Sequence, residues 1–139
     1  MTIAIERALR SIEWLALLLG GGFTLVAMQH GAGWKFEWSW FYPWALSPYV
    51  VYFLFSRRAE KGSPYALIAG VIGAVLMLAF TGLVYGNFMW FSKSSTGALV
   101  FIFAPFWMLV GGPLVLALLL ALHLAICRLL IRWREPGKT

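Results

Sequence analysis

The sequence contains no aspartate and few charged residues of any kind. Only 12% of its 139 residues are Asp, Glu, Lys or Arg, whereas 62% are hydrophobic, and the mean hydropathy is +0.83. A soluble domain has roughly a quarter charged residues and about half apolar ones. This chain cannot cover its apolar residues with a water-soluble surface. We therefore predict an integral membrane protein, with residues 1–139 forming a single transmembrane domain.

Cysteine and histidine are also scarce. Cys127 is the only cysteine, which excludes an intramolecular disulfide. His30 and His123 are the only histidines, and the spans given below place them near opposite membrane faces, so we expect no shared haem or metal site within one protomer. Paired carboxylates and a phosphate-binding glycine loop are missing from the sequence. We expect a non-enzymatic protein with no catalytic residue, no metal site and no cofactor.

Four long apolar stretches remain, and they predict an all-α bundle of four transmembrane helices. They cover approximately residues 12–28, 41–55, 65–86 and 98–131. We expect the first stretch to be retained as a span and not cleaved as a signal peptide. Pro48 lies inside the second stretch, where it predicts a kink that neighbouring groups must support.

The fourth stretch is too long for one upright span. As a single helix it would measure about 50 Å, against a hydrocarbon core of about 30 Å. It forms one long tilted helix, a long helix kinked at Gly111-Gly112-Pro113, or a re-entrant segment over residues 98–110 followed by a full span. We favour the kinked helix.

The basic residues are divided unevenly between the polar segments, and this predicts the orientation. Nine of the eleven fall before the first stretch, between the second and third, or at and beyond the end of the fourth, while only Lys35 and Lys93 fall in the other two segments. Loops rich in Lys and Arg stay cytoplasmic, so both termini should be cytoplasmic. The nine are Arg7, Arg10, Arg57, Arg58, Lys61, Arg128, Arg132, Arg134 and Lys138.

This charge pattern also bears on location and partners. The pI of about 9.9 is explained by residues that flank apolar spans, where anionic lipid headgroups are the natural counter-charge, and we expect no nucleic-acid binding. The small size and short loops favour a bacterial inner membrane.

Small residues in the third stretch predict close helix packing. Gly70 and Ala74 are four residues apart, and Gly73 lies beside them. This spacing lets helices approach closely, either within the monomer or between copies.

The segment after the first stretch is rich in aromatic residues. Trp34, Trp38 and Trp40 alternate with other residues next to Lys35. Such rings form an interfacial belt at the level of the lipid headgroups, or a surface that binds a partner. We take these four residues as the candidate partner-binding site.

Two ionisable residues are candidates for a polar network or a transport pathway. His123 lies within the fourth apolar stretch, where an ionisable residue is costly. Glu13 precedes the first apolar run beside Arg10, and we expect it at the cytoplasmic interface. Alternatively, His123 is a neutral imidazole that forms a hydrogen bond with a neighbouring helix.

These observations favour a protein that binds another membrane component, as an accessory subunit or an immunity protein against a membrane-active toxin does. The expected partners are membrane lipid and another membrane protein or a second copy. The alternative is a small oligomeric transporter or channel. Its site would lie at the midplane, where Gly20-Gly21-Gly22 and Gly111-Gly112-Pro113 would break two helices and expose backbone groups.

Overall fold

All four predicted spans correspond to helices, and each helix is longer than the apolar stretch that predicted it. The computed structural model describes residues 3–32, 41–61, 65–91 and 97–134. Three of the helices are long and apolar enough to cross a membrane, over Ile3–His30, Ala66–Trp90 and Leu99–Ile131. The chain is therefore a membrane-embedded helical protein. The four helices are α1 (Ile3–Ala32), α2 (Phe41–Glu60), α3 (Ala66–Phe91) and α4 (Gly97–Arg134).

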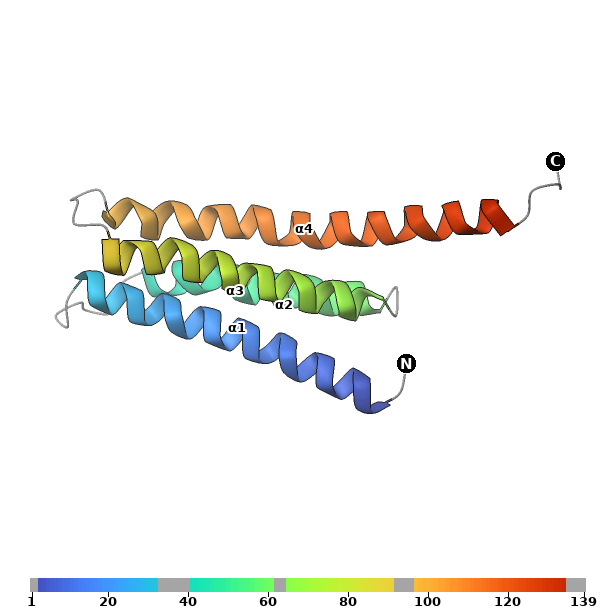
Figure 1. Cartoon of the computed structure of the whole chain (residues 1–139). Helices are drawn as coiled ribbons and strands as arrows, with labels where there is room; N and C mark the ends of the chain where they lie inside the picture. Colours follow the sequence, from blue (N-terminus) through green and yellow to red (C-terminus); the bar gives the residue numbers. More distant parts are fainter. Residues whose placement is uncertain (1–2, 33–40, 62–64, 92–96, 135–139) are drawn as a thin grey trace.

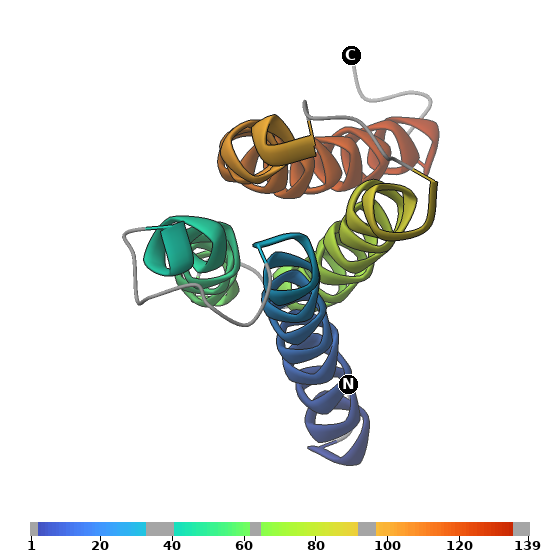
Figure 2. The ribbon, with the colours of Figure 1, turned by 90° about the vertical axis from the view of Figure 1, so that its left-hand side faces the viewer.

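The helices alternate in direction along the bundle. In Figure 1, α1 and α3 run one way and α2 and α4 run the other, so the two ends of the chain lie at the same end of the bundle. Viewed along its length, the bundle has α1 between α2 and α3, with α4 on the side formed by α2 and α3 (Figure 2). The most extensive packing joins α1 to α3 and α2 to α4, and α1 barely meets α4.

Pro48 is accommodated inside α2 by its neighbour. A proline at position 48 has no N–H to give to the carbonyl of Trp44, four residues earlier. Ser47 Oγ donates a hydrogen bond of 2.7 Å to that carbonyl instead. The Trp44 indole in turn donates to the Ile102 carbonyl of α4 over 3.3 Å. A serine side chain therefore replaces the missing backbone donor, as it does in other membrane helices.

The fourth helix is continuous. It has 38 residues and passes through Pro105 and Pro113 without interruption. Figure 1 shows a shallow curve and no sharp bend in α4. The re-entrant alternative for residues 98–110 is therefore wrong, because those residues belong to the same helix as the span that follows. The sharp kink that we favoured at Gly111-Gly112-Pro113 is not found either, because the helix only curves gently. With α3 at 26 residues and α2 at 20, α4 extends well past the end of the bundle.

Candidate functional site

Glu13 is buried completely where three helices meet. Ser56 of α2 donates a hydrogen bond of 2.5 Å from Oγ to Glu13 Oε1. Arg57 brings Nη2 to 3.6 Å from the other carboxylate oxygen, Oε2. On α3, a Cβ at Gly70 would lie 2.5 Å from Ser56 Oγ and 3.2 Å from Glu13 Oε1. Because Gly70 has no side chain, the Glu13 carboxylate and the Ser56 hydroxyl fit between the helices.

A chain of opposite charges connects Glu13 to the exposed end of the bundle. Arg57 Nη1 donates to both oxygens of Glu60, at 3.2 and 3.1 Å. Glu60 Oε2 also lies 3.0 Å from Arg10 Nη1, and Arg10 Nη2 donates 2.9 Å to Glu6 Oε1. Two guanidinium groups therefore pair with three carboxylates. Of the three, the Glu13 carboxylate is the one that is completely buried.

The pairing of Glu13 is incomplete. Among the described residues, its Oε2 has no hydrogen-bond partner, although Arg57 is near. A buried carboxylate is costly unless it is paired and hydrogen-bonded. The junction of α1, α2 and α3 therefore holds a buried carboxylate whose two close partners are Ser56 and Arg57.

The sequence did not indicate this environment for Glu13. We expected it beside Arg10 at the interface, but Arg10 pairs with Glu6 and Glu60. The signal that was present is the spacing of polar residues on α2: Tyr49, Tyr52 and Ser56 recur at three and four residues and so share one helical face.

Tyr52 occupies the next level of this face, between α3 and α4. Its ring is fully buried, and its hydroxyl donates 2.8 Å to the Gly70 carbonyl. A Cβ at Gly73 would overlap the Tyr52 hydroxyl and lie 2.9 Å from Cζ, and one at Gly112 would lie 3.1 Å from Cδ2. Gly70 and Gly73, predicted to allow close helix packing, make room for polar side chains of α2. Ala74, the third of these residues, is fully buried in the core.

Tyr49 forms a hydroxyl cluster near the middle of the bundle. Its hydroxyl lies 2.8 Å from Thr24 Oγ1 and 2.7 Å from Thr81 Oγ1. Each threonine also contacts the carbonyl one turn earlier on its own helix, Gly20 at 2.9 Å and Met77 at 2.7 Å. The three hydroxyl groups have three protons for these four short contacts, so one contact at a time has no proton between its two oxygens.

The glycine triplet of α1 does not break the helix, and its first member, Gly20, has a packing role. A Cβ at Gly20 would lie 2.7 Å from Cε1 of Tyr49. The helix continues from Ile3 to Ala32 through all three glycines, and α4 continues through Gly111 and Gly112. Both helices stay helical through these points, so the broken helices on which the transporter alternative was based are not found.

His123 lies at the basic end of the bundle, where its ring packs on Tyr65 with 4.1 Å between centroids. Its Nε2 lies 3.5 Å from Sγ of Cys127, one turn later. His30 is in the last turn of α1, at the opposite end of the bundle. No group of three or more His, Cys, Asp or Glu side chains suited to a metal ion occurs in the described ranges.

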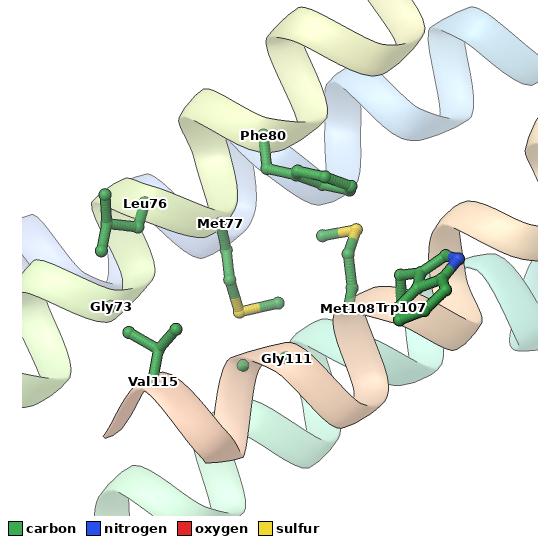
Figure 3. Close-up of a pocket in the computed structure, with 9 residues that line it drawn as sticks. Gly73, Leu76, Met77, Phe80, Trp107, Met108, Gly111 and Val115 are labelled. Atoms are coloured by element: carbon green, nitrogen blue, oxygen red, sulfur yellow. The ribbon is translucent and has the colours of Figure 1, made fainter. Parts of the chain in front are cut away.

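An apolar cavity of about 600 Å³ lies between α3 and α4. Figure 3 shows Met77 of α3 and Met108 of α4 pointing into the same space, with Phe80 and Trp107 at one side. Gly111 forms part of its wall, and a Cβ there would meet nothing within 4 Å. Because Gly111 has no side chain, nothing from this position fills the space between α3 and α4.

The fourth helix is the most exposed of the apolar helices. Only 6% of its most apolar stretch is buried, against 39% in both α1 and α3. Large apolar residues recur along its outer side at three- and four-residue spacing from Phe103 to Leu122, with one further step of seven residues to Leu129, and all are at least half exposed. We call them the α4 outer stripe: Phe103, Phe106, Val110, Leu114, Leu118, Leu122 and Leu129.

The candidate partner-binding residues Trp34, Lys35, Trp38 and Trp40 lie outside the described residues. Their role as a partner surface or an interfacial belt stays a prediction.

A comparison with known protein families, curated proteins and solved structures found no match to this chain. Its class, a membrane-embedded bundle of helices, follows from its own residues: three long apolar helices with a polar interior at the junction of α1, α2 and α3.

Proposed function

We propose that this chain is a non-enzymatic membrane protein that acts by binding a transmembrane helix of another protein along the α4 outer stripe. All four helices cross the membrane in this proposal, with both termini cytoplasmic in a bacterial inner membrane. An accessory subunit of a membrane complex and an immunity protein both act in this way. The observation that carries the proposal is the continuation of the stripe beyond the end of the bundle.

The topology is supported by the arrangement of the helices and by the charges. The two chain ends share one end of the bundle, and Arg10, Arg57 and Arg58 belong to that same end. At 20 residues, α2 is about 30 Å long, which matches the hydrocarbon core of a bilayer.

The polar residues at each end mark the depth of the bundle in the membrane. From Arg10 to Gln29, which hydrogen-bonds Tyr42 at the other end, α1 rises about 28 Å. Leu120 of α4 lines a groove with Arg58 and so lies at the level of the basic end. His123 still packs on Tyr65 at this end, so α4 continues beyond it only from about residue 124 to Ile131, a rise of about 11 Å.

This continuation remains apolar. Leu124, Ile126, Leu129, Leu130 and Ile131 are each between 49% and 63% exposed. Covering one of them would be worth about 1 kcal/mol, and Leu129 is the one that belongs to the outer stripe. In this proposal these residues lie beyond the hydrocarbon core and beyond the other helices, so their exposed apolar surface favours a partner.

The charges favour a different protein over a second copy. Arg128 is exposed on this part of α4, and the sequence continues with Arg132 and Arg134. A second copy in the same orientation would bring these positive charges together at one level, which is unfavourable. A partner helix with acidic residues at its cytoplasmic end would complement them.

Photo-crosslinking from the outer stripe tests the proposal: Leu122→Cys in a Cys127→Ser background places the single cysteine on the stripe, because Cys127 itself lies on the face of His123. A maleimide carrying a photoreactive group is attached in membranes of the organism that makes the protein. We expect one adduct to a different membrane protein, mapped to a transmembrane helix of that partner. Leu129→Arg should abolish this adduct.

The matched control is Ile5→Arg, which adds the same charge at the same end of the bundle on an exposed residue of α1. It should leave the adduct unchanged. An adduct of two identical chains, or equal loss with both variants, would overturn the proposed partner. Unreacted monomer in all samples would overturn the binding function itself.

A further inference from the structure

A groove between α2 and α4 combines one unpaired positive charge with an apolar channel. Its volume is about 260 Å³, and its walls include Phe55 and Ala59 of α2 with Leu116, Ala117 and Leu120 of α4. Arg58 stands among them as the one charged residue. Because Phe55 lies one turn deeper than Ala59, the groove runs from the basic end toward the apolar part of the bundle.

Arg58 differs from the neighbouring arginines in its pairing. Arg57 is bound by Glu60 and Glu13, and Arg10 by Glu6 and Glu60. Arg58 is exposed and forms no ion pair with any residue that the structure describes. Within this cluster the carboxylates are already engaged, so the charge of Arg58 is free for an external anion.

We propose that this groove binds an anionic phospholipid, with the phosphate on Arg58 and one acyl chain along Phe55, Leu116 and Ala117. The guanidinium fork fits two phosphate oxygens at once. Basic pockets between helices at the cytoplasmic side are suited to such headgroups. The inference depends on the membrane-embedded bundle and not on the proposed partner helix, which binds the outer stripe of α4.

The location of the groove identifies a lipid as the source of the phosphate. Free phosphate would use Arg58 alone, since the other wall residues offer it no hydrogen bond. A phospholipid uses both parts, because its acyl chain fills the apolar channel while its headgroup stays at the interface. Exposed Lys61 follows at the same end and adds positive potential near the headgroup.

Native mass spectrometry of the purified full chain tests this site. The protein is released from nanodiscs that contain phosphatidylglycerol and phosphatidylcholine in fixed proportion, and the retained lipid is counted. We expect preferential retention of one phosphatidylglycerol. Arg58→Gln should lower that retention about fivefold, the effect of one basic residue near a membrane surface.

Two further variants separate a built site from general attraction. Arg7→Gln removes the same charge from an exposed arginine at the same end, but Arg7 does not line this groove; retention should not change. Ala117→Phe keeps every charge and fills the channel, and it should lower retention as Arg58→Gln does. Equal losses with Arg7→Gln and Arg58→Gln would overturn the site, as would full retention in Ala117→Phe or displacement of the lipid by inorganic phosphate alone.

Discussion

Replacing Gly73 by alanine should destabilise the bundle, although alanine is the better helix former. The added Cβ would overlap the hydroxyl of Tyr52 and lie 2.9 Å from its Cζ, inside a fully buried contact. Extra atoms in a packed core cost about 1–3 kcal/mol. Gly82→Ala on the same helix is the matched control, because a Cβ at Gly82 meets nothing within 4 Å. That change should be neutral or stabilising by up to about 1 kcal/mol.

Thermal unfolding in mild detergent, followed by far-ultraviolet circular dichroism, measures the difference in stability. We expect the midpoint of Gly73→Ala to fall several degrees below that of Gly82→Ala. Tyr52→Phe in the Gly73→Ala background should recover part of the loss, because it removes the overlapping oxygen. If Gly73→Ala and Gly82→Ala unfold together, Tyr52 does not occupy the space beside Gly73 and the packing described for α2 and α3 is incorrect.

Further predictions concern the polar interior and use the same unfolding assay. Tyr49→Phe removes the hydroxyl that joins two threonines and should cost about 1–2 kcal/mol. Tyr85→Phe should cost nothing or stabilise slightly, because the buried Tyr85 hydroxyl has no hydrogen-bond partner among the described residues; equal effects of the two would contradict the hydroxyl cluster. Glu13→Ala leaves Ser56 without its acceptor and should cost about 1–3 kcal/mol, whereas Glu6→Ala, which removes an exposed pair, should change stability by less than about 1 kcal/mol. A loss with Glu6→Ala as large as that with Glu13→Ala would show that the buried junction adds nothing.

The number and positions of the helices could be predicted because they depend on properties that are local in the sequence. Long apolar stretches predict helices in a lipid environment, since every backbone N–H and C=O must then be hydrogen-bonded within the segment. The bounds were less accurate. The first helix begins at Ile3, well before the apolar run that starts near residue 12, because Arg10 pairs with Glu6 on the same helix and extends the regular backbone past the apolar part.

The candidate site was predicted less well, and the reason lies in α2. Its tyrosines and serine read as ordinary members of an apolar stretch, since Tyr is common at membrane interfaces. Only the packing of α1 and α3 on α2 shows that Tyr49, Tyr52 and Ser56 all face inward. Gly70 and Gly73 were correctly predicted to be packing residues. The sequence could not show that they pack against side chains of other helices and not against a neighbouring backbone.

Composition and spacing along the chain determine that this protein belongs in a membrane, that it is helical, and where its helices lie. Each of these depends on how a segment of backbone satisfies its own hydrogen bonds in an apolar solvent. The burial of Glu13, the tyrosine hydroxyls between glycines and the projection of α4 were decided only by the tertiary structure. They depend on which helix faces meet and at what relative height, and those relations join residues far apart in the sequence, such as Glu13 with Ser56 and His123 with Tyr65.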